Sequence, residues 1–157
     1  MDTHSLLAVS PIDGRYASKT EPLKSYFSEF ALIRYRIRVE IEYFIALCEI
    51  PLPQLADVDK SKYQAMRDIY LNLTPEQAME VKEIEKTTNH DVKAVEYFIK
   101  RHFHELGLDK WSEFVHFGLT SQDINNTSQP MMLKEAMENV YMPALKEVLD
   151  IISGMAE

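Results

Sequence analysis

Cysteine and glycine are scarce in this sequence of 157 residues, which contains one cysteine, Cys48, and four glycines. A single cysteine excludes an internal disulfide framework and makes a reducing cytoplasm the natural location. No Cys/His cluster has zinc spacing and no acidic loop has the EF-hand pattern, so we expect no metal site. The few glycines, together with long stretches of apolar residues at helical spacing, predict an all-α protein.

Long hydrophobic runs and an excess of positive charge are missing as well. No apolar run approaches the roughly 20 residues that a membrane-spanning helix needs, and the first four residues lack the features of a secretory signal. The net charge is −8, which argues against nucleic acid as the main partner. We therefore expect a cytoplasmic protein with no nucleic-acid or membrane partner. An anionic small ligand would have to be held by a few local cations and helix ends.

Apolar residues at three- and four-residue steps predict a long first helix over about 22–48, with Thr20 able to cap it. Shorter helices are expected at about 59–73, 75–88 and 91–106. A Thr-Pro-Glu-Gln capping box precedes the second of these, and a glycine follows the third as a stop signal. The apolar face of the first helix comprises Leu23, Phe27, Phe30, Ile33, Ile37, Ile41, Phe44 and Ile45.

A last helical segment begins at Thr120 and still has helical character where the sequence stops at Glu157. Pro130 predicts a kink in it, and Pro143 a break or a kink. A frayed natural terminus and truncation explain the missing C-terminal cap equally well. The apolar stripe of this segment comprises Ile124, Met131, Met137, Val140, Leu145, Leu149 and Ile152.

Three polar segments interrupt the apolar pattern, and the first is Ser10-Pro-Ile-Asp-Gly-Arg-Tyr16. Arg15 offers a planar, permanently charged fork that suits a phosphate or a carboxylate, and Tyr16 could add a hydroxyl donor. A surface turn with an ordinary arginine would explain the same residues.

The second polar segment, residues 86–93, separates two predicted helices, and Asn89 or Asp91 is well placed to cap the later one. Backbone N–H groups at a helix start can bind an anion. His90 titrates nearest neutral pH and could orient a polar ligand or relay a proton. A cap followed by a solvated loop is the plainer interpretation.

The third polar segment, residues 118–126, opens the last helix, where Thr120 or Ser121 would be an ordinary N-cap and Asp123 would favour the positive helix end. Its density of hydroxyl and amide groups exceeds what capping requires. By itself, however, this pattern indicates only a polar binding site of unknown ligand.

Taken together, Ser10–Tyr16, Thr87-Thr-Asn-His-Asp-Val-Lys93 and Thr120-Ser-Gln-Asp-Ile-Asn-Asn126 resemble the adenylosuccinate lyases in order and in spacing. The resemblance covers essentially the whole chain, and the Thr-Thr-Asn-His-Asp-Val stretch is highly specific. Fumarase and argininosuccinate lyase, of the same superfamily, carry a different motif in place of Thr-Ser-Gln-Asp.

The resemblance implies a purine nucleotide substrate and no cofactor. Arg15 and Tyr16 would contact the nucleotide, with Arg15 directed toward the phosphate. The same pocket would be lined by Asn89, His90 and Asp91. A carboxylate of the succinyl arm would be bound by Thr120 and Ser121, and two secondary candidates are Lys93 and Gln122.

The reaction implied by the resemblance is a β-elimination, in which a base removes a proton beside a carboxylate and an acid protonates the departing nitrogen. In the family these groups lie in a Thr-His-Gly-Gln motif and in a mobile serine loop, and this sequence contains neither. We therefore expect an N-terminal part of the enzyme that is inactive alone and carries no catalytic acid or base. Residues 1–110 would form a small helical N-terminal domain, and 111–157 would begin the central helical bundle of a homotetramer. Self-association of the isolated chain is expected.

Two other classes of protein fit the sequence. One is a short protein that kept the lyase-like domain as a binding or regulatory module, and the other is a generic helical interaction domain. An in-frame Thr-His-Gly-Gln motif downstream would favour the enzyme, whereas replaceable Arg15 and His90 would favour the interaction domain.

Overall fold

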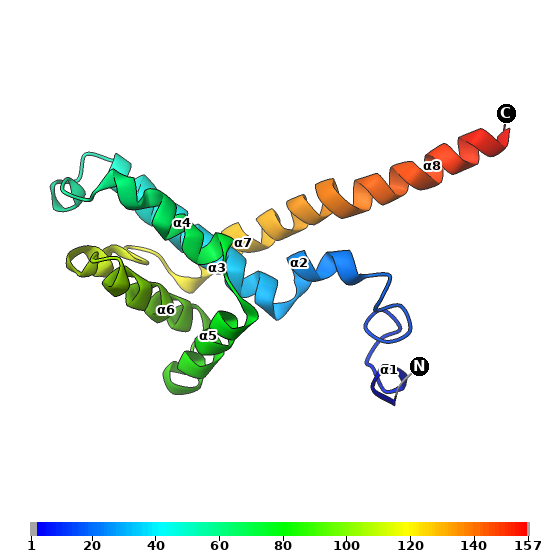
Figure 1. Ribbon diagram of the computed structural model, residues 1–157, viewed down its shortest axis with the longest axis horizontal. Helices are drawn as coiled ribbons and strands as arrows, with labels where there is room; N and C mark the ends of the chain where they lie inside the picture. The colour runs from blue at the N-terminus through cyan, green and yellow to red at the C-terminus, as the bar shows by residue number, and fades with distance from the viewer. Residues whose placement is uncertain (1–2, 157) are drawn as a thin grey trace. The chain divides into compact units, whose positions relative to one another are not determined.

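The computed structural model describes residues 3–156, and within them the chain is helical with no strand, which confirms the all-α prediction (Figure 1). The chain divides into two compact units: residues 32–131, and a second unit drawn from 1–31 and 132–157. The predicted boundary near residue 110 concerns the complete protein and stays a prediction. No helix in the described range is long and apolar enough to cross a membrane.

The helices are α1 (Thr3–Leu6), η1 (Glu21–Leu23), α2 (Lys24–Phe27), α3 (Glu29–Glu49), η2 (Pro53–Leu55), η3 (Lys60–Lys62), α4 (Tyr63–Leu71), α5 (Pro75–Thr88), α6 (Asp91–Glu105), η4 (Asp109–Phe114), α7 (Ser121–Ala136), the π-helical turn η5 (Met137–Tyr141) and α8 (Met142–Ala156).

The predicted first helix is interrupted at Ser28, so that α2 ends there and α3 begins after it. Ser28 is extended, with φ −77° and ψ 163°, and its hydroxyl accepts a hydrogen bond from the Ala31 N–H at 3.1 Å. The Ser28 hydroxyl therefore caps the start of α3, the role that the sequence suggested for Thr20. The expectation for Thr20 is wrong, because its hydroxyl donates to the carbonyls of Ile12, Tyr16 and Ala17 instead.

The core of residues 32–131 is built around α3 and α6. The C-terminal part of the predicted apolar face is buried, whereas Phe27, before the break at Ser28, is 53% exposed. The Phe44 and Phe103 rings meet edge to face, with centroids 4.9 Å apart. The α5 and α6 helices pack against each other. The buried apolar side chains of α3 include Ile33, Ile37, Ile41, Phe44 and Ile45, and those of α6 include Val92, Val95, Phe98, Ile99 and Phe103.

Local capping explains where the shorter helices begin. The predicted capping box of α5 is confirmed: the Gln77 N–H donates to the Thr74 hydroxyl at 3.3 Å, and the Thr74 N–H donates to the Gln77 side chain at 3.0 Å. Asp59 caps a 3-10 turn rather than an α-helix, so α4 begins at Tyr63, later than predicted. Gly107 follows α6 with a φ of +68°, the left-handed conformation that a glycine stop supplies.

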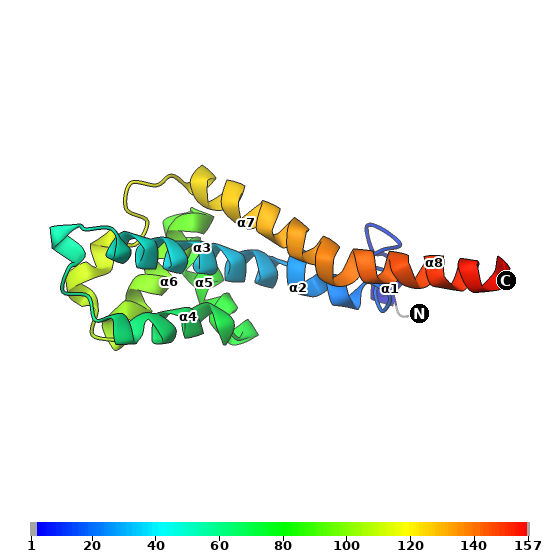
Figure 2. The same cartoon turned by 90° about the horizontal axis from the view of Figure 1, so that it is seen from above.

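Pro130 lies inside α7 and Pro143 lies in the first turn of α8, and a π-helical turn separates the two helices. The kink predicted at Pro130 and the break or kink predicted at Pro143 stay predictions. Proline lacks an N–H and crowds the carbonyl one turn earlier, and the π-helical turn Met137–Tyr141 ends two residues before Pro143. Figure 2 labels α7 and α8 along this segment, and the π-helical turn η5 lies between them in the sequence. Ile124 is fully buried, whereas Leu149 and Ile152 are 55% and 58% exposed. A single chain thus covers only the beginning of the apolar stripe.

Candidate functional site

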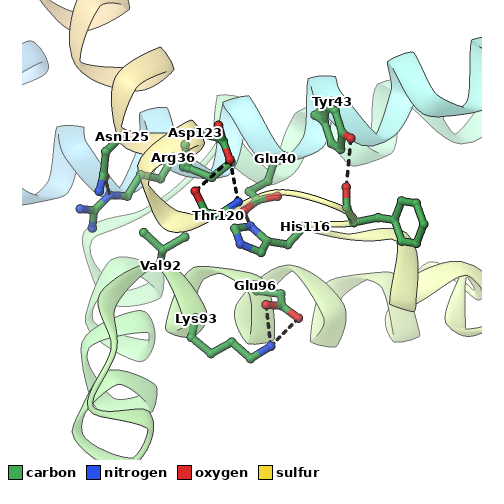
Figure 3. Close-up of polar contacts among 12 residues, drawn as sticks. Arg36, Glu40, Tyr43, Val92, Lys93, Glu96, His116, Thr120, Asp123 and Asn125 are labelled. Atoms are coloured by element: carbon green, nitrogen blue, oxygen red, sulfur yellow. Dashed lines mark hydrogen bonds and ion pairs between the residues drawn. The ribbon is translucent and has the colours of Figure 1, made fainter.

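Two of the three polar segments lie in the unit of residues 32–131, and one buried side chain joins them. Arg36, in α3, is 5% exposed. Its Nη2 lies 2.7 Å from Asp91 Oδ2 at the start of α6, and its Nε donates to Asn125 Oδ1 in α7 at 3.0 Å (Figure 3). The segments 86–93 and 118–126, far apart in the sequence, are therefore held to the same arginine.

His90, rather than Asn89 or Asp91, is the N-cap of α6, which corrects the capping prediction. Asn89 has a φ of +51° and closes α5, because asparagine tolerates the left-handed conformation that ends a helix. His90 is left extended, and its Nδ1 accepts the Lys93 N–H at 3.1 Å. Since Nδ1 accepts, Nε2 carries the proton of the neutral ring.

Asp91 lies at the first position of α6 and is held as a carboxylate. Partial burial opposes its ionisation, but the hydrogen bond from the Val92 N–H and the charge of Arg36 together lower the pKa of Asp91 below its ordinary value. An open hollow of about 530 Å³ lies over this helix junction. Its lining residues are Lys82, Glu85, Lys86, Asn89, His90 and Asp91.

Thr120 and Ser121 stand at the start of α7, where the donors of Thr120 are already engaged. The Thr120 N–H and hydroxyl both donate to Asp123 Oδ2, at 2.7 and 2.9 Å. These bonds lower the pKa of Asp123. The helix start thus holds a carboxylate from its own first turn, and a substrate carboxylate at Thr120 would have to compete with Asp123.

The two secondary candidates have partners within the chain. Lys93 Nζ donates to both carboxylate oxygens of Glu96, at 2.9 and 2.8 Å. Glu96 is 4% exposed; burial opposes its ionisation, but the bonds from Lys93 and Lys100 lower its pKa overall. The Gln122 amide donates to Asn126 Oδ1 at 3.0 Å.

The loop before Thr120 is attached to α3 through residues that sequence reasoning missed. His116 has a φ of +61°, unusual for a residue with a side chain, and its Nδ1 lies 2.5 Å from Glu40 Oε1. Tyr43 donates its hydroxyl to the Phe117 carbonyl at 3.0 Å. Glu40 is fully buried, and burial raises its pKa, an effect that the bond to His116 only partly opposes.

One sequence signal could have revealed Arg36 and Glu40. Both are charged residues inside the apolar pattern of the first helix, next to the core positions Ile37 and Ile41. Charged side chains that lie beside core positions need partners, and here the partners come from residues more than fifty positions away in the sequence.

Arg15 and Tyr16 belong to the other unit, so the site described above consists of residues 32–131 alone. Arg15 Nη2 donates to the Tyr16 hydroxyl at 2.9 Å, and its guanidinium carbon lies 4.6 Å from the centre of the Tyr16 ring. Gly14, directly before them, is buried, and a Cβ there would lie 2.6 Å from the Ser5 carbonyl oxygen. The turn therefore requires glycine and presents an exposed Arg15.

Comparisons with known proteins agree with the resemblance over nearly the whole chain. The chain is 53% identical over 148 residues to an adenylosuccinate lyase of Dictyostelium discoideum, covering 92% of this chain and 32% of that protein. It is 46% identical to the adenylosuccinate lyase of Vibrio cholerae and 40% identical to that of Escherichia coli K12, covering 100% and 99% of this chain and 35% of each relative. The chain thus spans about a third of the length of the curated relatives it matches. Residues 14–157 match the lyase family, and the chain belongs to that family.

Proposed function

We propose that this chain is the N-terminal part of an adenylosuccinate lyase. The complete enzyme would cleave adenylosuccinate to AMP and fumarate, and the succinylcarboxamide ribotide (SAICAR) to AICAR and fumarate. The observation that carries the proposal is the identity to adenylosuccinate lyases along the whole chain. It is supported by Arg36, which binds two of the three polar segments that carry the resemblance.

His90 would orient the substrate by donating a hydrogen bond. Its Nδ1 is engaged by the Lys93 N–H, so the proton of the neutral ring lies on Nε2. In this state the ring can donate a hydrogen bond to a substrate acceptor. Asn89 and Asp91 would line the same hollow over the start of α6.

Thr120 and Ser121 would bind a carboxylate of the succinyl arm, where negative charge gathers as the proton leaves the adjacent carbon. Thr120 already donates two hydrogen bonds to the Asp123 carboxylate, and the same donors would hold a substrate carboxylate that displaces Asp123. Arg15 would bind the phosphate, and Tyr16 would contact the nucleotide. The catalytic acid and base would come from outside this chain, and no cofactor takes part.

The complete enzyme would be a cytoplasmic homotetramer, and α7 and α8 would open its central helical bundle. The exposed apolar side chains of α8 support this assignment, because uncovered apolar surface of several hundred Å² is typical of a contact surface. The same surface should make the isolated chain associate with itself.

Fumarate release tests the proposal at two levels. The purified 157-residue chain should release no fumarate from adenylosuccinate, whereas the complete enzyme should. Turnover by the chain alone that survives repurification would refute the external acid and base. An inactive complete enzyme would refute the proposed activity.

Two substitutions in the complete enzyme test the residue roles. Arg15→Met should weaken substrate binding and leave the fold intact, since Arg15 is exposed and a charged hydrogen bond contributes about 1.5–3 kcal/mol. His90→Ala should lower kcat/KM by about two orders of magnitude or more. Unchanged KM and kcat for Arg15→Met would contradict the phosphate role. A large fall in melting temperature with retained activity would make His90 a packing residue.

A further inference from the structure

Three polar side chains on α3, here called the α3 polar row, bind the segment that carries Thr120. They are Arg36, Glu40 and Tyr43, spaced at helical steps that place them on one face. Arg36 binds Asn125 at 3.0 Å, Glu40 lies 2.5 Å from His116, and Tyr43 binds the Phe117 carbonyl at 3.0 Å (Figure 3). One rigid helix therefore contacts the loop before Thr120 and the beginning of α7.

The charged members of this row are buried, so the desolvation penalty offsets much of the stability that their contacts provide. Arg36 and Glu40 are 5% and 0% exposed, and well-packed apolar residues are often as stabilising as a buried ion pair. Glu40 Oε2 is also buried without a hydrogen-bond partner in the described part of the chain. Apolar side chains in its place would make none of these hydrogen bonds to Asn125, His116 and the Phe117 carbonyl.

Arg36 differs from the other two because it binds both polar segments at once. Its Nη2 contacts Asp91, adjacent to His90, and its Nε contacts Asn125, one turn into α7. The planar guanidinium fixes the angle between these two contacts, whereas a lysine ammonium is a single point charge on a flexible stem. Arg36 thus sets the start of α6 and the start of α7 at a defined separation.

We propose that the α3 polar row, with Arg36 as its principal member, positions His90 and Thr120–Ser121 for the reaction of this site. These are positioning residues, which act through Asp91, Asn125, His116 and the Phe117 carbonyl. The inference rests on the proposed function, because it assigns those segments to substrate binding.

The test compares Arg36→Lys and Asn125→Ala with Arg67→Met in the complete enzyme. Arg67 makes a two-point ion pair with Glu42, at 2.8 and 2.9 Å, outside the candidate site, so it controls for loss of a structural arginine pair. Arg36→Lys and Asn125→Ala should each lower kcat more than they raise KM. The expected loss in kcat/KM is on the order of 100-fold, the effect of misplacing reacting groups by about 1 Å. Asn125→Ala keeps the buried arginine and its pair with Asp91, so it provides a folded variant if Arg36→Lys does not fold.

The outcomes separate this inference from the proposed function. A wild-type complete enzyme that does not cleave adenylosuccinate would refute the function itself. With an active wild type, kcat/KM values of Arg36→Lys and Asn125→Ala within about twofold of wild type would overturn the positioning role. An equal loss in Arg67→Met would also overturn it, since the effect would then be a general loss of structure. Lower kcat in the site variants, with an active Arg67→Met, supports it.

Discussion

Residues 32–131 contain almost all of the protein's buried side chains, whereas every residue from 141 to 156 is exposed. Both regions carry apolar residues at helical spacing, as Phe103 in α6 and Leu149 in α8 illustrate. The difference is that α6 packs against helices of its own unit, while α8 displays its apolar residues at the surface. Amphipathic spacing therefore specifies which face of a helix needs a partner and leaves open whether the same chain supplies it.

The largest expected effect comes from removing a ring from the core. Phe103→Ala in the 157-residue chain should lower the free energy of unfolding by about 3–5 kcal/mol, because Phe103 is fully buried against Phe44. The matched change in the other region, Leu149→Ala, should cost less than about 0.5 kcal/mol. Urea unfolding measures both values. Similar losses in a monomeric sample would mean that α8 is covered within one chain and would break the comparison.

A smaller effect should follow from a helix cap within the 32–131 unit. Thr74→Ala removes the hydroxyl that accepts the Gln77 N–H, and the unfolding free energy should fall by about 1 kcal/mol. Thr87→Ala is the matched control: it removes a threonine hydroxyl from the exposed last turn of α5 and should change the unfolding free energy less. Equal effects in urea unfolding would show that the capping box adds little to the stability of this unit.

The ion pair between α3 and α4 should contribute less again and should depend on pH. The hydrogen bond from Arg67 lowers the pKa of Glu42; burial opposes this and Tyr70 adds to it. A lowered pKa means that the stabilisation is present above the ordinary value of 4.5 and is lost as the pH falls through the folded-state pKa. Because the Glu42 side chain is 38% exposed, solvent screening should limit the contribution to below about 1 kcal/mol.

Thermal unfolding of Glu42→Gln at neutral and acidic pH checks this sign. The stability difference from wild type should be largest at neutral pH and should vanish in acid. Glu83→Gln, which removes an exposed pair with Lys86, serves as the control variant. A difference for Glu42→Gln that grows on acidification would contradict the assigned direction.

The smallest effect on folding, and the sharpest test of the exposed region, is expected for Leu149→Glu. The unfolding free energy should change by less than about 0.5 kcal/mol, since Leu149 is an exposed residue. Light scattering across a concentration series should show association of the wild type and weaker association of the variant. A strictly monomeric wild type whose α8 amides are protected from hydrogen exchange would show that α8 finds its cover within one chain.

Helix positions in the core unit could be predicted because their signals are local. The Thr74 capping box, the end of α5 near Thr88 and the stop at Gly107 each depend on a few adjacent residues. Prediction was wrong where two local signals compete: Thr20 and Ser28 can both cap, and Ser28 does. His90 likewise became the α6 cap once Asn89 had closed α5.

The sequence by itself determined the all-α class, the apolar faces and the three polar segments, because helix periodicity and capping act over one or two turns. Only the tertiary structure decided that Arg36 joins Asp91 to Asn125 and that Glu40 meets His116. Those contacts link residues distant in the sequence, and each depends on how α3 packs against α6 and α7. A charged residue in an apolar helix indicates that a buried partner is needed, but packing alone selects which residue it is.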